Sequence, residues 1–185
     1  MNPKLQKKIS NLENLERFPA DELFEYLPIN KNDHILDLGA GTGYISLSIA
    51  ERVKTVYAFD YDKDILKYLE TVAKERNIAN IKTVEGDFKE IPLENDTIDI
   101  AIASISLHEV QPLKSVLKEI KQVLKERGLF LCMELEKNET STGPRVSSKD
   151  MEVEILDAGF SIVEKIYPTT KIANQSVYMI LAQKS

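Results

Sequence analysis

Three glycines fall within five positions where an apolar run ends, in the segment "LDLGAGTGYIS" at residues 36–46. Glycine at 39, 41 and 43 permits positive backbone angles and lets a ligand approach the main chain, while amides at the start of the next helix favour negative charge. Such a turn suits a carboxylate or a phosphate. The same glycines are also compatible with a turn that needs them for packing alone.

An aspartate closes the next apolar run, "TVYAFD". This residue, Asp60, lies 21 residues after Gly39, where a carboxylate can accept hydrogen bonds from both hydroxyls of a ribose. The alternative is a helix-capping role, for which Asp62 or Asp64 is better placed. The position therefore indicates a nucleoside.

A second acidic residue follows the third apolar run, in "EGDF". Here Asp87 comes directly after Gly86, and its carboxylate could accept from an adenine amino group while Phe88 packs beside the base. The glycine turn and the two aspartates together describe an adenosine nucleoside with a short charged tail.

Other nucleotide ligands fit the glycine spacing less well. Dinucleotide folds carry G-x-G-x-x-G, whereas the spacing here is G-x-G-x-G, and Asp37 would repel a pyrophosphate but tolerate a cationic ligand. Asp37 could equally hydrogen-bond the glycine turn and hold its shape. A P-loop is excluded because no Lys-Ser or Lys-Thr follows the glycines.

The elements that must position these residues alternate between strand and helix. Five strands are expected first, at residues 34–39, 55–60, 81–87, 97–104 and 129–135. Helices are expected between or after them, at residues 44–53, 61–77, 113–128 and 147–160. This α/β alternation with continuously apolar strands predicts a mostly parallel sheet with helices on both faces. The last two runs, 160–167 and 176–183, are joined by too short a loop for a parallel crossover, so they should form an antiparallel pair.

No repeat, linker or low-complexity tract divides the chain, so one domain is expected over 1–185, with a helical cap or lid at 1–30, helical near 20–27, and a core at 31–185. The net charge of -6 gives no broad basic field, so no nucleic-acid partner is expected. The sole cysteine, Cys132, excludes an internal disulfide framework, and a reducing, cytoplasmic setting fits. No apolar run is long enough to span a membrane, and no His and carboxylate cluster argues for a metal.

With these residues in view, the chain resembles the class I S-adenosylmethionine-dependent methyltransferases over residues 30–185. The likeness rests on "LDLGAGTGYIS", "FDYD", "EGDFKEIPLENDTIDIAIAS" and "LKERGLFLCME" in this order. The segment "IPLENDTIDIAIASISLHEV" is most similar to the small ubiquinone and menaquinone C-methyltransferases. The resemblance implies a Rossmann-like sandwich with a seven-stranded sheet and an EC 2.1.1 activity, with S-adenosyl-L-methionine as cofactor and S-adenosyl-L-homocysteine as product.

The resemblance also implies site residues, carried over only to matching positions. The glycine turn would bind the methionine portion, Asp60 the ribose, and Asp87 with Phe88 the adenine. Tyr61 would cover the other adenine face, and Ser104 would offer its backbone carbonyl to the cofactor's ammonium group. The full cofactor-binding set expected is Asp37, Gly39, Ala40, Gly41, Gly43, Asp60, Tyr61, Gly86, Asp87, Phe88 and Ser104.

Methyl transfer from a sulfonium needs a base only where the acceptor must lose a proton. In "SISLHEV", His108 and Glu109 follow the fourth strand, and His108 is the candidate base or acceptor-orienting group; shaping the pocket is the alternative role. His34 is expected to be structural. Arg17 and Phe18 in the cap could approach an acceptor or the cofactor carboxylate, although a surface salt bridge or packing under a loop is favoured for them. Arg145, after Gly143-Pro144, could reach an acidic acceptor, although a position in an exposed loop is favoured.

The main hypothesis is therefore a methyltransferase acting on a small molecule by direct displacement, as a monomer or homodimer. The alternative from another class is a non-catalytic module that binds S-adenosylmethionine or S-adenosylhomocysteine and acts through a partner protein. A nicotinamide dehydrogenase is the third hypothesis, and it predicts protection by NAD.

Overall fold

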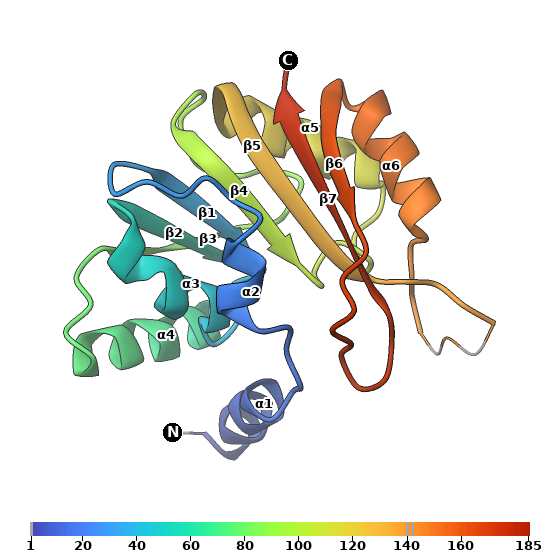
Figure 1. Cartoon of the computed structure of the whole chain (residues 1–185). Coiled ribbons are helices and arrows are strands. Elements are labelled where there is room, and N and C mark those ends of the chain that lie inside the picture. Colours follow the sequence, from blue (N-terminus) through green and yellow to red (C-terminus); the bar gives the residue numbers. More distant parts are fainter. Residues whose placement is uncertain (1, 140, 142) are drawn as a thin grey trace. The chain divides into compact units, whose positions relative to one another are not determined.

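The computed structural model describes residues 2–139, 141 and 143–185 (Figure 1). The chain divides into two compact units, Met1–Asp87 and Phe88–Ser185. The first contains the glycine turn and the second contains His108.

The first unit is built on three parallel strands in the order β3-β2-β1. They are β1 (His34–Leu38), β2 (Thr55–Asp60) and β3 (Ile81–Glu85). The helices are α1 (Pro3–Glu13), α2 (Ala20–Phe24), α3 (Tyr44–Ile49), the 3-10 turn η1 (Ala50–Arg52) and α4 (Lys63–Glu75). The strand positions match those expected, and α3 ends earlier than residue 53 because the chain tightens into η1.

The core of this unit explains why α4 lies along the strands. Leu69 of α4 is fully buried against Ala58 of β2 and Ala40 of the glycine turn. Asp62 caps α4 by accepting from the amides of Asp64 and Ile65 at 2.9 and 3.1 Å. The choice between Asp62 and Asp64 as the cap is thereby decided for Asp62, which leaves Asp60 without a capping role.

The N-terminal helix α1 was not expected from the apolar pattern, because it buries only Ile9. It begins at an Asn2 cap with Pro3 in the first turn, a combination that favours a helix start. Lys8 pairs with Asp62, and Tyr68 of α4 donates to Glu13 at 2.5 Å. Polar contacts to α4 therefore hold α1 in place.

The second unit contains four strands in the order β4-β5-β7-β6 (Figure 1). β4 (Ile98–Ser104) and β5 (Leu124–Leu135) are parallel, whereas β6 (Phe160–Ile166) and β7 (Val177–Lys184) form the expected antiparallel pair. α5 (Leu113–Val123) packs against β5 and against α6 (Ser148–Asp157).

One expected boundary in this unit is wrong. The pattern predicted a helix over 113–128, but α5 ends at Val123 and β5 begins at Leu124. The carbonyls of Gln122 and Val123 accept from the amides of Asp96 and Thr97 at 3.1 and 2.9 Å, so they are not available to a further helical turn. Leu124 is extended and pairs with Ile98. Tertiary pairing thus overrides the helical pattern.

Candidate active site

The glycine turn is fastened to the end of β2 by main-chain hydrogen bonds. The amides of Gly39 and Ala40 both donate to the Phe59 carbonyl at 2.9 Å, and the Gly43 amide donates to Ala40 at 2.8 Å. All three glycines have positive φ, of 77°, 53° and 91° in chain order. These amides therefore fix the shape of the turn through bonds within the protein.

Asp60 joins this turn directly. Its carboxylate is 8% exposed and accepts from the Gly41 amide and from the Asp62 amide, both at 2.9 Å. An ionised carboxylate has about four acceptor positions, so two remain after these bonds. The structure brings together the two features that the sequence predicted to act jointly, and it leaves Asp60 able to accept from a pair of hydroxyls.

The three glycines do not serve one purpose. A Cβ on Gly43 would lie 2.2 Å from Leu69 Cδ1 and 3.2 Å from Leu47 Cγ, so packing of α4 explains this glycine. A Cβ on Gly41 would meet only the Gly39 carbonyl oxygen, at 4.0 Å. The packing explanation thus accounts for Gly43, whereas Gly41 leaves free space at the surface of the turn.

Asp37 is a buried carboxylate, 2% exposed, that holds the start of α3. It accepts from the amide of Ser46 at 3.0 Å and from its hydroxyl at 2.5 Å. Burial raises the pKa of Asp37 to about 6, although the Ser46 hydrogen bonds oppose that rise. The bonds to Asp37 that the structure shows come from Ser46 of α3, whereas the sequence suggested bonds to the glycine turn itself.

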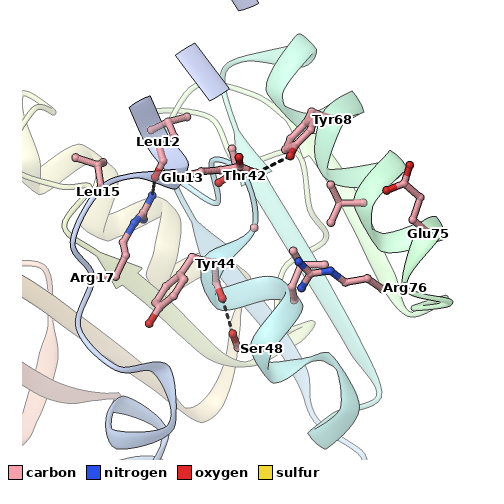
Figure 2. Close-up of a pocket in the computed structure, with 13 residues that line it drawn as sticks. Leu12, Glu13, Leu15, Arg17, Thr42, Tyr44, Ser48, Tyr68, Glu75 and Arg76 are labelled. Carbon is pink, nitrogen blue, oxygen red and sulfur yellow. Dashed lines mark hydrogen bonds between the residues drawn. The ribbon is translucent and has the colours of Figure 1, made fainter. Parts of the chain in front are cut away.

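A cavity of about 770 Å³ lies beside the turn, between the end of α1, α3 and α4 (Figure 2). Arg17 lines it, donating to the Leu12 carbonyl at 2.9 Å, with its guanidinium 5.5 Å from the centre of the Tyr44 ring. Tyr44 in turn donates to the Phe18 carbonyl at 2.9 Å. Burial lowers the pKa of Arg17, while the charge of Asp37 opposes this shift. The structure therefore places a half-buried cation close to the glycine turn.

The remaining predicted residues of the first unit lie at the carboxyl ends of β2 and β3. The Gly86 amide donates to the Asp60 carbonyl at 3.2 Å, which brings the start of "GDF" to the end of β2. Asp87 is exposed, and Tyr61 is 69% exposed, with the Lys8 ammonium 5.1 Å from its ring centre. Two strand ends of the predicted nucleoside site are thus adjacent.

In the second unit, Phe88 is half-buried and Ser104 ends β4, paired with Met133 of β5. The next residue, Ile105, has a φ of 53°, which is a strained angle for a β-branched side chain. Its amide donates to the Met133 carbonyl at 2.8 Å. The chain therefore makes a sharp, tightly held turn directly after β4.

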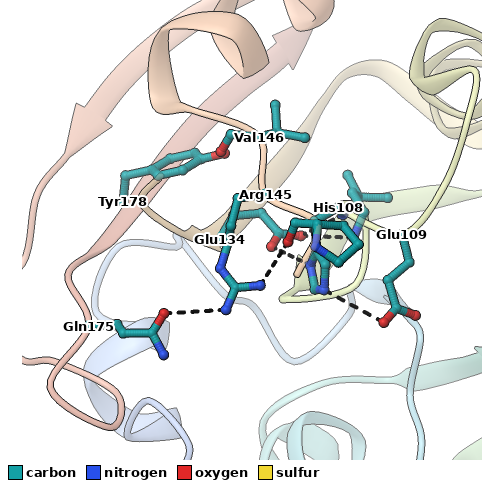
Figure 3. Close-up of polar contacts among 9 residues, drawn as sticks. His108, Glu109, Glu134, Arg145, Val146, Gln175 and Tyr178 are labelled. Carbon is teal, nitrogen blue, oxygen red and sulfur yellow. Dashed lines mark hydrogen bonds and ion pairs between the residues drawn. The ribbon is translucent and has the colours of Figure 1, made fainter. Parts of the chain in front are cut away.

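His108 follows that turn and is bound to a carboxylate that the sequence reasoning missed. Its Nδ1 lies 2.8 Å from Oε2 of Glu134, a β5 residue with no exposed surface (Figure 3). The other oxygen, Oε1, accepts from the amides of Leu107 at 2.8 Å and His108 at 3.3 Å. The hydrogen bond to Glu134 is the main reason that the pKa of His108 is raised above its ordinary value, against the opposing effect of burial.

Arg145 lies close to this pair, and its charge lowers the pKa of His108 (Figure 3). Its guanidinium donates to the Pro144 carbonyl at 2.7 Å and to Gln175 Oε1 at 3.3 Å. Its Nε is buried without a hydrogen-bond partner among the described residues. The expectation of an exposed arginine in a loop is therefore wrong, because the Arg145 side chain is half-buried close to His108 and Glu134.

A family model described as "Methyltransferase domain" matches residues 29–183. The chain belongs to this methyltransferase family. It is 31% identical over 117 residues, 62% of its length, to a demethylmenaquinone methyltransferase of Geobacillus, covering 50% of that protein. It is 30% identical over 130 residues, 66% of its length, to a ubiquinone/menaquinone biosynthesis C-methyltransferase of Rickettsia massiliae, covering 52% of that protein. The chain thus spans about half the length of these curated relatives.

A solved SAM-dependent methyltransferase from Aquifex aeolicus has the same fold, with a TM-score of 0.84 at 20% identity over 97% of this chain and 98% of that one. The expected Rossmann-like methyltransferase fold is confirmed: seven strands, mostly parallel, with antiparallel C-terminal strands and surrounding helices. The expected methyltransferase family is confirmed as well.

Two features bear on membrane and metal binding. In the described part of the chain, no helix of this methyltransferase is both long and apolar enough to cross a membrane. Across residues 2–139, 141 and 143–185, no three or more His, Cys, Asp or Glu side chains are grouped to hold a metal ion.

Proposed function

We propose that this chain transfers a methyl group from S-adenosylmethionine to a small-molecule acceptor by direct displacement. The observation that carries the proposal is the bond between the Gly41 amide and the buried Asp60 carboxylate. In a chain of the methyltransferase family, it joins a turn with free space at Gly41 to an acceptor of hydroxyl hydrogen bonds.

The donor and acceptor groups of the first unit fit this cofactor. Asp60 would accept from the ribose hydroxyls, and the turn at 39–43 would lie along the methionine portion. Arg17 lies beside the turn and offers a positive charge to the cofactor carboxylate, while the amides of Gly39, Ala40 and Gly43 are bonded within the protein. Adenine would be met by Gly86 and Asp87, with Tyr61 on its other face. The family resemblance also assigns Phe88 to the adenine and the Ser104 carbonyl to the ammonium group, and both of these residues belong to the second unit.

S-adenosylmethionine, when bound, supplies an activated methyl carbon on a positively charged sulfur. The protein's task is therefore to hold the acceptor atom in line with that carbon and to exclude water. Asp37 contributes by fixing the start of α3 behind the turn. None of these tasks requires a nucleophile on the protein. Cys132, a buried free thiol, therefore has no role in the proposed reaction.

A small acceptor is favoured by the names of the curated relatives, which denote methyltransferases of quinone biosynthesis. The net charge of -6 also opposes a nucleic-acid substrate. The proposed setting is the cytoplasm, where the single cysteine would stay reduced, and the proposed state is a monomer or homodimer.

Thermal unfolding with four ligands tests the proposal. S-adenosylmethionine and S-adenosylhomocysteine should each stabilise the chain, by about 2.7 kcal/mol at 100 times the dissociation constant, while NAD and ATP should not. A shift with NAD alone would support a dehydrogenase. Binding of both adenosyl ligands without methyl transfer to any member of a broad acceptor panel would favour a binding module that acts through a partner.

A further inference from the structure

The second unit gathers three ionisable side chains at one edge of its parallel strands. His108 follows β4, Glu134 lies near the end of β5, and Arg145 belongs to the segment before α6 (Figure 3). The carboxyl ends of parallel strands are where ligands bind in open α/β sheets. The group therefore lies at the edge where chemistry is expected, and each member comes from a different segment of the chain.

The hydrogen bonds of Glu134 fix the orientation of the imidazole. Two backbone amides hold Oε1, so Oε2 is left for Nδ1 at 2.8 Å. Because an ionised carboxylate only accepts, Nδ1 must carry the proton. The lone pair of the neutral ring is then on Nε2, whose nearest acidic neighbour is Glu109, 3.8 Å away and largely exposed.

Shaping the loop alone does not account for a carboxylate here. The two amides of Leu107 and His108 could be satisfied by a neutral acceptor, such as a backbone carbonyl or a glutamine. Burying a charge without surface exposure is costly unless it is paired. Pairing with His108 offsets that cost and increases the basicity of the ring, which is the arrangement of a general base held by an orienting carboxylate.

Resting on the methyltransferase function proposed above, we propose that Glu134 is a positioning residue that makes His108 Nε2 a general base. The acceptor is accordingly a molecule whose reacting atom must lose a proton, namely a phenol, an alcohol or a carbon acid. Thiolates and unprotonated amines are nucleophilic without such a base, so we do not expect them to be the acceptors of this chain.

In the step itself, His108 Nε2 takes the proton from the acceptor's O–H or C–H bond. The electron pair left on that oxygen or carbon forms the new bond to the methyl carbon, while the carbon–sulfur bond breaks and its electrons remain on sulfur. The products are the methylated acceptor, S-adenosylhomocysteine and an imidazolium, which returns its proton to water. Arg145, with a buried Nε that has no described partner, would stabilise the anion formed when the proton leaves.

Nuclear magnetic resonance of the imidazole nitrogens tests the positioning role without any acceptor. Between pH 5 and 9, the neutral His108 ring should carry its proton on Nδ1, and its pKa should lie above 6.5. Glu134→Gln should lower that pKa and abolish the preference for one tautomer. The matched control, Glu109→Gln, removes an exposed carboxylate on the other side of the ring and should change the pKa much less. A neutral ring protonated on Nε2, or equal effects of the two variants, would overturn the proposal.

The catalytic part is tested with four probe acceptors: a phenol, a 1,3-diketone, a primary amine and a thiol. Methylation should be confined to the first two, with kcat rising with pH through the pKa of His108. His108→Gln should lower kcat by about 10²- to 10⁴-fold, and Glu134→Gln should lower it and shift the pH profile downward. Transfer to the amine or thiol alone, or an unchanged kcat in His108→Gln, would contradict the general base. Binding of S-adenosylhomocysteine, measured on the same samples, separates failure of this inference from failure of the proposed function.

Discussion

Each unit buries a carboxylate on a parallel strand, but the two are satisfied differently. Asp37 on β1 is 2% exposed and accepts from the amide and hydroxyl of Ser46. Glu134 on β5 is fully buried and accepts from two amides and from an imidazole. Burial raises the pKa of Asp37 to about 6 against the opposing effect of the Ser46 hydrogen bonds, whereas Glu134 has an imidazole partner that can carry positive charge.

This difference in partners distinguishes a carboxylate with a structural role from one with a chemical role. A buried carboxylate held by a serine and an amide fixes the chain around it, and its raised pKa reflects the cost of burial. A buried carboxylate held to a histidine also determines where that ring keeps its proton. The two carboxylates are buried to nearly the same extent, so burial does not indicate which of them has a chemical role. The hydrogen-bond partner of each carboxylate does indicate it.

The largest effect is expected from Glu134→Ala. Removing one member of a buried pair typically costs about 3–5 kcal/mol, because the partner groups stay buried and unsatisfied. Since the pKa of His108 is raised on folding, its share of the loss should be largest below pH 6.5 and should fade as pH rises through the raised value. Urea unfolding at pH 5.5 and 8.5 measures both the loss of stability and its dependence on pH. Glu109→Ala is the control and should stay within about 0.5 kcal/mol of the wild type.

A somewhat smaller effect is expected from Asp37→Asn, and it should depend on pH. Because burial raises the pKa of Asp37 from 3.8 to about 6, the folded chain binds more protons than the unfolded chain between these values. Its contribution to stability therefore falls as pH rises through that window, by about 3 kcal/mol. Asn cannot titrate, so the variant's stability should fall less between pH 4 and pH 7. An unchanged pH profile relative to the wild type would contradict this assignment; the exposed Asp64→Asn should retain the wild-type profile.

The two glycines at 41 and 43 sharpen the comparison within the first unit. Gly43→Ala should cost about 2–3 kcal/mol, because its Cβ overlaps Leu69 and its φ is positive. Gly41→Ala should cost only about 1 kcal/mol, since its Cβ meets open space, but should weaken binding of S-adenosylhomocysteine. Urea unfolding on both variants should show the larger loss of stability for Gly43→Ala, and calorimetric titration should show the weakened binding for Gly41→Ala. Equal losses of stability would mean that both glycines serve packing.

The smallest effect is expected from Lys8→Ala, which removes the ion pair with Asp62. The lysine side chain is 39% exposed, so water and salt screen the pair, and less than about 1 kcal/mol should be lost. Urea unfolding in low and high salt measures this. A loss as large as that of Glu134→Ala would show that exposure does not distinguish these pairs.

Much of the first unit could be predicted from local sequence, because its signals are short-range. The apolar run before Gly39, the Asp60 strand end and the Asp62 cap each lie within a few residues of the element they define. Parallel-strand topology predicted that the turn and Asp60 lie at the same edge of the sheet, but the hydrogen bond between Gly41 and Asp60 was not predicted. Helix α1 escaped the apolar pattern because polar contacts hold it, although the Asn2-Pro3 start was readable.

The second unit was less predictable because its decisive contacts join distant residues. Glu134 was a single acidic residue in the apolar run "LFLCMEL", and nothing local indicates that it meets His108, 26 residues earlier. Likewise, α5 ends where Asp96 and Thr97 occupy its last carbonyls. A charged residue inside an apolar strand is the one local signal that could have drawn attention to the pair.

Calorimetric titration of S-adenosylhomocysteine into the wild type, Asp60→Ala and Asp64→Ala tests the central claim most directly. The wild type should bind, and loss of the Asp60 carboxylate, which also holds Gly41, should weaken binding by at least about 100-fold, as expected for two charge-assisted hydrogen bonds. Asp64→Ala removes an exposed carboxylate four residues away and should bind within about twofold of the wild type. Absence of binding to the wild type, or equal affinity in Asp60→Ala, would contradict the assignment of this turn as the cofactor site.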